Sequence, residues 1–417
     1  MSEIINTPEV DSTAVEDPNA LVAEAPSYTE RRNIGQLLRG DLGFIPVLIT
    51  LIIIMVFFQL ITNGLFFSTG NLTNLFLQTA QIGLVGLGVI LVLLLGEIDL
   101  SVAAVSTLCG VVMGVLSERV GLPPWLSIPG ALLAGALAGF INGYFIAVLR
   151  IPSFIVTLAA SISYSGLLIT LLTGQATLQI NNTFIDNIAG TPTSYFPDAL
   201  GIVLPTAAVL LYVLYRVINY RRRASMGLRN PGLPQLLAYL IIPIVLVEGA
   251  IILFESNHGV PYSTGILFGA IVLFWILLTK TSWGRHVYAV GGNKEAARRA
   301  GISVVGTQLI VFTLCSALAA MGGIIEASYT FSASTQISPF LLLNAIAAPV
   351  IGGVSLFGGR GSVWMLVLGV LIIGSLSNGL ALKNLGPDAL QIIEGLVPLI
   401  AVTVDAVIRR LQAGTGR

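Results

Sequence analysis

A long apolar run followed by two carboxylates stands near the start of the chain: residues 72–101 read LTNLFLQTAQIGLVGLGVILVLLLGEIDLS. Residues 72–95 carry no charged side chain, and about 20 apolar residues are enough for an α-helix to cross the hydrocarbon core of a bilayer. Similar segments recur along the chain, at 44–62, 72–95, 101–118, 125–149, 153–174, 199–219, 235–255, 263–280, 306–328, 339–357, 362–382 and 388–408. The sequence therefore predicts an all-α, polytopic integral membrane bundle of about 10–12 transmembrane helices.

The composition favours one membrane domain over several soluble ones. Of the 417 residues, 55% are hydrophobic and 10% are charged, whereas soluble domains have roughly 25% charged residues. The 20 basic and 20 acidic residues cancel, so no basic field indicates nucleic acid as a partner. The two cysteines, Cys109 and Cys315, lie in separate apolar runs and indicate neither a metal site nor a disulfide framework.

The two ends of the chain differ from this apolar middle. Residues 1–43 intersperse acidic side chains with Pro, Ser, Thr and Ala, without helical periodicity. That composition predicts a disordered N-terminal tail. We expect one transmembrane domain at 44–410 and a short C-terminal tail at 411–417.

The positions of Lys and Arg predict how the helices are oriented, because short loops rich in these residues stay in the cytoplasm. With twelve spans and a cytoplasmic N-terminus, the basic clusters all fall inside: Arg31 to Arg39, Arg150, Arg216 to Arg229, Lys280 to Arg299, Arg360, and Arg409 with Arg410. Loops 175–198 and 256–262, which would lie outside, contain no Lys or Arg. Both termini are therefore expected in the cytoplasm.

Glycines predict irregular backbone in two of the apolar regions. Five of them crowd one stretch, Gly352, Gly353, Gly358, Gly359 and Gly361, and each glycine inside a helix destabilises it by about 1 kcal/mol relative to Ala. We expect broken helices or re-entrant segments near 96–104 and 339–357, with Pro349 at a position that would interrupt a helix. Glycines at four-residue spacing in 110–114 and 135–143 indicate close helix packing, which we assign to the interior of one subunit.

Glu97 and Asp99 are the charged groups that most need an explanation. Each carboxylate would cost about 2.5 to 3.5 kcal/mol at the centre of a bilayer, and such groups are functional by default. The alternative is a structural role at a helix junction, with Asp99 or Ser101 capping the next helix. Sequence spacing leaves both roles open. The isolated carboxylates, such as Glu248 and Glu326, are interpreted as interior structural groups.

The segment 283–302 reads as a short amphipathic helix in the cytoplasm. Asn293 can cap it, Glu295 suits its positive N-terminal end, and Gly301 can end it. Ala296, Ala297 and Ala300 would form a small-residue face for a groove on a partner, although a plain connecting loop is the alternative. No phosphate-binding Gly-x-x-x-x-Gly-Lys-Ser/Thr motif and no nucleophile triad is present. Any ATP hydrolysis must come from another chain.

Four of these segments together resemble one family. They are 97–102 (EIDLSV), 150–158 (RIPSFIVTL), 288–302 (YAVGGN to GI) and 350–359 (VIGGVSLFGG). The chain resembles the monosaccharide permease subunits of bacterial ABC importers, the ribose and xylose permease family, from about residue 44 to 410. Within it the chain looks most like the xylose branch, because of an inserted region around 175–262. Ala103 and Val354 depart from the residues usual in the family.

The resemblance implies partners and a coupling segment. It implies a separate ABC ATPase subunit that uses the ATP, an extracytoplasmic sugar-binding protein, a permease homodimer and a place in the bacterial inner membrane. The coupling segment that docks on the ATPase would comprise Gly291, Asn293, Glu295, Ala296, Ala297, Arg298 and Gly301.

We therefore expect a permease subunit for import of a neutral monosaccharide, xylose or a related sugar, that is not itself an enzyme and binds no metal or cofactor. The candidate translocation pathway comprises Glu97, Asp99, Ser101, Asn142, Asn344, Gly352, Gly353, Ser355 and Asn378. One alternative is an ion-coupled secondary sugar transporter that uses Glu97, Asp99 or Glu326 and works without an ATPase. A polytopic membrane enzyme ranks last, because loop 175–198 carries only two carboxylates.

Overall fold

The computed structural model describes residues 45–190, 194–228, 230 and 232–385, with single positions between 392 and 403. The expected tails at 1–43 and 411–417 lie outside the described residues, as does most of the expected span at 388–408. The helices are α2 (Ile45–Ile61), α3 (Thr69–Leu94), α4 (Val102–Gly114), η1 (Val115–Arg119), α5 (Pro124–Ala147), α6 (Ser153–Leu171), α7 (Thr183–Asp186), α8 (Asp198–Ser225), α9 (Leu233–Glu255), α10 (Tyr262–Lys280), α11 (Ser282–Gly292), α12 (Lys294–Arg299), α13 (Val304–Tyr329), α14 (Pro339–Ile351) and α15 (Met365–Leu382).

The prediction of a polytopic helical membrane protein is confirmed. Within the described part of the chain, nine helices are long and apolar enough to cross a membrane. Two shorter apolar helices, Pro46–Ile61 and Pro339–Ile351, accompany them. Eleven of the expected spans therefore contain a helix, and the count agrees with the predicted 10–12.

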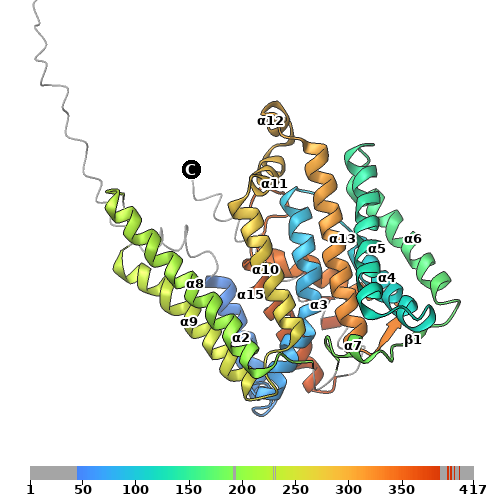
Figure 1. The fold of residues 1–417 in the computed structure, drawn as a ribbon, viewed down its shortest axis with the longest axis horizontal. Helices are drawn as coiled ribbons and strands as arrows, with labels where there is room; N and C mark the ends of the chain where they lie inside the picture. The colour runs from blue at the N-terminus through green and yellow to red at the C-terminus, as the bar shows by residue number, and fades with distance from the viewer. Residues whose placement is uncertain are drawn as a thin grey trace, which may run out of the picture. The chain divides into compact units, whose positions relative to one another are not determined.

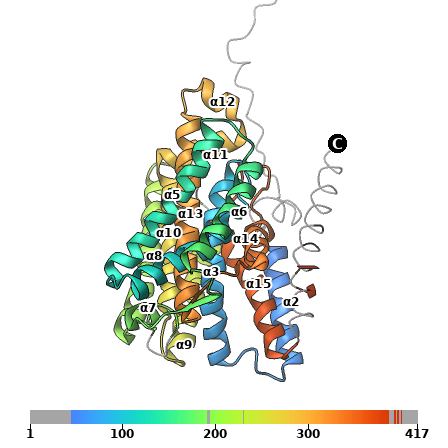
Figure 2. The same ribbon diagram turned by 90° about the vertical axis from the view of Figure 1, so that its right-hand side faces the viewer.

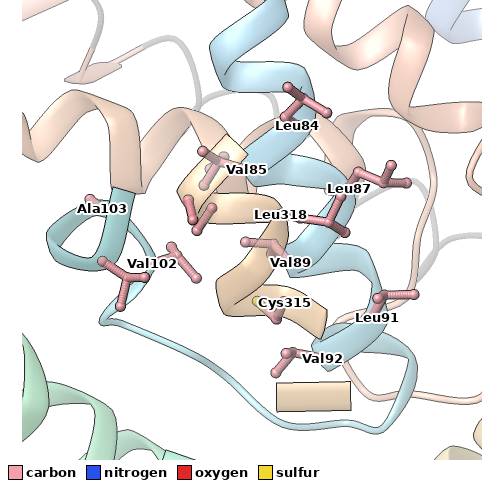
Figure 3. Close-up of a cluster of buried hydrophobic side chains, with 14 of the residues drawn as sticks. Leu84, Val85, Leu87, Val89, Leu91, Val92, Val102, Ala103, Cys315 and Leu318 are labelled. Atoms are coloured by element: carbon pink, nitrogen blue, oxygen red, sulfur yellow. The ribbon is translucent and has the colours of Figure 1, made fainter. Parts of the chain in front are cut away.

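The core of the bundle forms around α3 and α13, which lie side by side in Figure 1. α13 packs against α3, α4 and α5. Figure 3 shows side chains of α3 and α13 meeting those of α4, with Val89, Val102 and Leu318 among them. α3 buries 78% of its most apolar stretch inside the protein, so its sequence is apolar on nearly every side because protein surrounds it.

Glycines allow these central helices to approach closely. A Cβ added at Gly139 of α5 would lie 2.3 Å from the Phe312 carbonyl oxygen of α13. At Gly323 of α13 it would lie 1.7 Å from the Ser106 carbonyl oxygen of α4. No side chain fits at either place, so α4, α5 and α13 are in backbone contact. The predicted small-residue packing within one subunit is confirmed for the 135–143 stripe.

The α8–α9 pair is covered much less by the rest of the protein. Only 11% and 6% of the most apolar stretches of these two helices are buried. They pack on each other, and α9 also contacts α3. Figure 1 shows the pair at one side of the bundle. The Arg216 guanidinium of α8 lies 4.2 Å from the centre of the Tyr239 ring of α9, which fastens the ends of the pair near residues 216–239.

The backbone leaves helical geometry in both regions where glycines predicted it. Gly96 adopts φ 72° between α3 and α4, and the helix resumes at Val102. α14 has 13 residues and is thus about 20 Å long, shorter than the roughly 30 Å hydrocarbon core. Pro349 lies in the last turn of α14, and the non-helical loop 352–364 follows before α15 begins.

Two short strands connect loops at the end of the bundle opposite to α11 and α12. β1 (Thr177–Gln179) pairs antiparallel with β2 (Ser332–Ser334), with Leu178 opposite Ala333. The strands join the loop after α6 to the connection between α13 and α14. Figure 2 gives a second view of the bundle, with α12 at one end and α7 and α9 toward the other.

Candidate functional site

Four segments far apart in the sequence meet beyond the C-terminal end of α3, and we call this region the motif junction. It consists of residues 94–101, 150–157, 288–294 and 352–361. The Leu94 carbonyl accepts a hydrogen bond from Gly359 N at 2.9 Å. The Tyr288 hydroxyl of α11 donates to Gly361 O at 2.9 Å, and burial raises the pKa of this phenol, which therefore stays a neutral donor. α3, α11 and loop 352–364 are thereby joined.

The beginning of α6 supports the same region from another side. Thr157 Oγ1 accepts a hydrogen bond from Leu100 N at 3.0 Å, and Ser153 Oγ accepts one from Ile98 N at 3.4 Å. Unpaired backbone N–H groups away from water are costly, and these two hydroxyls satisfy two of them in the connection 96–101. All four motifs that carry the family resemblance thus lie together.

Glycine–backbone contacts make the motif junction tight. A Cβ added at Gly291 would lie 1.7 Å from Leu94 O and 2.8 Å from Gly359 N. Gly358 has φ 86°, and a Cβ added there would lie 2.7 Å from Gly291 O and 2.8 Å from Gly96 N. α11, the end of α3 and loop 352–364 therefore touch through backbone atoms, and displacement of one must displace the others.

Glu97 connects the motif junction to α12 and α13. Its Oε1 forms an ion pair with Lys294 of α12 and accepts a hydrogen bond from Gln308 Nε2 of α13 at 3.0 Å. The Glu97 side chain is 13% exposed and that of Lys294 is 46% exposed. Both partners belong to this chain, so the structure gives Glu97 a structural connection. Neither Lys294 nor Gln308 was among the predicted site residues.

Asp99 points the other way, into a buried polar network between helices. Its Oδ1 accepts hydrogen bonds from Ser101 N at 2.8 Å and Ser101 Oγ at 2.6 Å. Ser101 Oγ in turn accepts from Asn142 Nδ2 at 3.0 Å, and Asn142 Oδ1 accepts from the Tyr164 hydroxyl at 3.2 Å. Cys315 lies 3.9 Å from Asp99 Oδ2. The network links α4, α5, α6 and α13 around one carboxyl group.

This network revises the predicted roles of three pathway residues. Ser101 occupies the N-cap position of α4, but its side chain makes no capping bond; instead it bonds to Asp99. Asp99, Ser101 and Asn142 are 2%, 0% and 1% exposed. The structure brings the three side chains together and seals them from solvent in this conformation. Tyr164 was missed, because nothing in the sequence distinguishes it from other interior aromatic residues.

The remaining predicted pathway residues lie in three places. Gly352, Gly353 and Ser355 belong to the motif junction, where Ser355 N donates to Arg360 O at 3.0 Å and turns the loop. Asn344 is buried on α14. Asn378 of α15 bonds to two amides of α3, away from the motif junction. The nine predicted residues therefore do not line one continuous surface.

Asn378 belongs to a group of polar side chains that we call the amide seam. It consists of Asn71, Asn74, Gln78 and Gln81 of α3, Tyr329 of α13 and Asn378 of α15. Asn71 Nδ2 donates to Asn378 Oδ1 at 2.9 Å, and Asn378 Nδ2 donates to Gln78 Oε1 at 3.3 Å. The Tyr329 hydroxyl donates to Asn74 Oδ1 at 3.3 Å. Amides at helical spacing inside an apolar run were the missed signal.

The expected coupling segment folds as two helices rather than one. α11 ends at Gly292, Asn293 is extended with φ −161°, and α12 begins at Lys294. Asn293 Oδ1 caps α12 by accepting from Ala296 N at 2.9 Å, and Gly301 with φ 82° follows its end. Both predicted terminal roles are confirmed. The prediction of a single helix over 283–302 is wrong, and Ala297 of the expected small-residue face is buried.

The side chains of α12 show which part of the segment is free to meet a partner. Ala297 is buried against the protein, whereas Ala296 and Ala300 are exposed. Glu295 lies 3.4 Å from Arg298 and 3.6 Å from Arg299, and all three side chains are more than half exposed. The described residues contain no group of three His, Cys, Asp or Glu side chains placed to hold a metal ion.

Comparison with known proteins agrees with this arrangement. The chain matches the family described as the branched-chain amino acid transport system permease component over residues 71–402. It is 36% identical to the xylose transport system permease protein XylH of Haemophilus influenzae over 86% of this chain and 95% of the relative. It is 34% identical to XylH of Escherichia coli K12 over 89% and 93% of the two chains.

Permeases named for other sugars are also similar. The fructose import permease protein FrcC of Rhizobium meliloti is 32% identical over 94% of this chain and 92% of its own length. No solved structure matches the chain. The resemblance to sugar permeases seen in the four motifs is confirmed over most of the sequence, and the chain belongs to this family of membrane permease components of transport systems.

Proposed function

We propose that this chain is the membrane permease subunit of an ATP-driven importer for a neutral monosaccharide, with xylose or a related pentose as the substrate. The observation that carries the proposal is the motif junction, because it joins α11 to the end of α3 through backbone contacts. The same junction links the exposed helix α12 and the central helix α13 to Glu97 through the side chains of Lys294 and Gln308. Relatives of high coverage are named for xylose transport.

The mechanism starts at α12. A separate ATPase subunit binds its exposed face, which carries Glu295, Arg298 and Ala296, while Ala297 packs inward. Movement of α12 is transmitted by the Lys294–Glu97 ion pair and by the Gly291 contact with Leu94. The C-terminal end of α3 and loop 352–364 then move together. A sugar-binding protein delivers cargo at the opposite face, and two copies of the permease enclose the passage.

The alternative of an ion-coupled transporter is less well supported. It needs carboxylates that can bind and release an ion, but Glu97 is paired with Lys294 and Gln308. Asp99 is sealed and bonded to Ser101. In the proposed arrangement this chain supplies no nucleotide site and holds no cofactor. The protein lies in the bacterial inner membrane with both termini in the cytoplasm.

The test is sugar uptake by the reconstituted complex. The chain is purified with its ATPase and binding protein in liposomes, and uptake is compared across pentoses and hexoses with and without ATP. We expect uptake only with ATP and the highest rate with xylose or a close pentose. Uptake by the chain alone along an ion gradient would contradict the proposal.

A pair of charge variants tests the coupling role of α12. Glu295→Lys should reduce ATP-dependent uptake at least tenfold while the protein still inserts into the membrane. Ser225→Lys, which adds a charge at the exposed end of α8, is the matched control and should retain uptake. Equal uptake by Glu295→Lys and the wild type would disprove the coupling role.

A further inference from the structure

The amide seam lies along one face of α3 in an otherwise apolar helix. Asn71, Asn74, Gln78 and Gln81 are spaced by three, four and three residues, which places them on one side of the helix over about 15 Å. All four residues are partly exposed, although the most apolar stretch of α3 is more deeply buried than that of any other candidate span in the described part of the chain. An exposed strip therefore opens in the half of α3 remote from the motif junction.

Helix α13 faces this strip and places the carboxylate of Glu326 near its middle. A Cβ on Gly322 would lie 3.2 Å from Gln81 O, and the Tyr329 hydroxyl bonds to Asn74. These contacts fix the two helices antiparallel. Glu326 lies four residues from Gly322 and three from Tyr329, on the same face of α13 and level with Gln78. Glu326 is partly exposed.

Packing alone accounts for only part of the amide seam. Asn71, Asn378 and Gln78 bond to each other, so they could serve to hold α3 against α15. Asn74 bonds to Tyr329 instead, and Gln81 and Glu326 lie outside that cluster and are partly exposed. Exposed polar groups at membrane depth are tolerated only where they face water or protein, since lipid cannot satisfy them. A strip that faces an aqueous passage would satisfy these groups.

We propose that the amide seam, with Glu326, is a sugar-binding surface along which the hydroxyl groups of a neutral monosaccharide form hydrogen bonds during passage through the permease. This deepens the proposed function and rests on it. Amide groups both donate and accept, a carboxylate accepts, and the Tyr329 ring offers a flat face. That set matches a ring of neutral hydroxyls, and a few convergent polar groups in apolar surroundings are typical of small-molecule sites.

The same two helices connect this surface to the motif junction. α3 runs from Gln81 to Leu94, and α13 runs from Glu326 back to Gln308 beside Glu97. A displacement at the motif junction therefore shifts the facing walls of the amide seam. The bound sugar exchanges one set of amide partners for the next over the 15 Å length, without a step that leaves its hydroxyls unpaired.

The first experiment measures whether the amide seam is accessible to water, and it does not depend on sugar transport. Asn74→Cys and Gln81→Cys are exposed in intact cells to a charged, membrane-impermeant thiol reagent. Thr73→Cys is the control, because Thr73 neighbours Asn74 but is 1% exposed. Native Cys109 and Cys315 are fully buried. We expect labelling of Asn74→Cys and Gln81→Cys at least tenfold faster than labelling of Thr73→Cys. Equal, slow labelling of all three would overturn the proposal.

The second experiment separates sugar contact from packing. In the reconstituted complex, Gln81→Leu and Asn74→Leu should lower D-xylose uptake at least tenfold, with a melting temperature close to that of the wild type. Thr73→Val should keep uptake. Uptake within twofold of the wild type, or a loss that follows the fall in melting temperature, would overturn the proposal. If the wild type transports no sugar, the proposed function fails, whereas the labelling result still reports on the aqueous strip.

Discussion

Gly291 occupies the place where α11 crosses the end of α3, and its missing side chain sets the distance between them. The nearest atoms to an added Cβ are the Leu94 carbonyl oxygen and Gly359 N, which are both backbone atoms. Backbone cannot rotate away as a side-chain tip can. The adjacent Gly292 has nothing within 4 Å of the corresponding position. Two neighbouring glycines therefore have different physical roles.

Replacement of Gly291 by Ala should separate α11 from α3. Overpacking of this kind costs about 1–3 kcal/mol, so we expect a lower melting temperature of the purified protein and loss of ATP-dependent uptake. Gly292→Ala provides the matched control and should change neither. If both variants behaved alike, the backbone contact would not be what transmits movement.

Glu97 and Asp99 show how far single residues can be interpreted from sequence. Their two-residue spacing and apolar surroundings singled them out, and the structure places both within the motif junction. Their roles could not be predicted, because the partners come from distant parts of the chain: Lys294 and Gln308 for Glu97, Asn142 through Ser101 for Asp99. Residue spacing cannot show which of these helices will pack beside a carboxylate.

α11 and α12 illustrate why one predicted helix became two. The 283–302 segment has helical composition, but Gly291 and Gly292 weaken the helix interior. Asn293 accepts the N–H of Ala296 and starts a new helix instead of continuing the old one. The change of direction exposes Glu295 while Ala297 stays buried. A cap in the middle of a helical pattern thus determines which face a partner can reach.

The Asn293 cap should matter for coupling more than for global stability. Loss of such a cap costs about 1 kcal/mol, so Asn293→Ala should fray α12 and weaken binding of the ATPase subunit, with little change in melting temperature. Asn293→Asp keeps an accepting oxygen at the cap and should stay close to the wild type. Binding can be measured by co-purification of the ATPase. Equal impairment of both variants would mean that the amide group itself contacts the partner.

Across the whole protein, hydropathy predicted the existence of the helices better than their lengths and contacts. Each expected span from 44 to 382 contains a helix, because an apolar run in a membrane must satisfy its own backbone. An interruption near 339–357 was expected from its glycines, but the residue at which α14 ends and the pairing of β1 with β2 were not. Both depend on contacts between segments far apart, which hydropathy does not report. The amide seam escaped notice because its residues lie within a run whose average is strongly apolar.

The predicted orientation has two apparent exceptions, Arg119 and Lys383, which fall in outside loops. Both cations bond to helix carbonyls in the structure: Arg119 Nη1 donates to Leu171 O at 2.7 Å and Lys383 Nζ donates to Ile61 O at 2.9 Å. A cation at the C-terminal end of a helix is stabilised by the unpaired carbonyls there. These two side chains therefore cap the C-terminal ends of α6 and α2, and their charges do not argue against the predicted orientation.

Thiol labelling from each side of the membrane can test that orientation. Ser256→Cys, in the exposed turn after α9, should react with an impermeant reagent added to intact cells. Ala300→Cys, exposed after α12, should react only once the cells are opened. The reverse pattern would invert the assignment of every loop, including the position of the coupling helices.

The central place of α13 also has a consequence for how the chain is made. α13 covers α3, α4 and α5, yet its last residues are synthesised roughly 180 residues after α5, a delay of about 10–40 s at usual rates of translation. During that interval the glycine-lined grooves of α5 and the Asp99 carboxyl have no α13 to pack against. The nascent protein therefore depends on the insertion machinery or on neighbouring lipid to keep its first helices apart from other chains until α13 arrives.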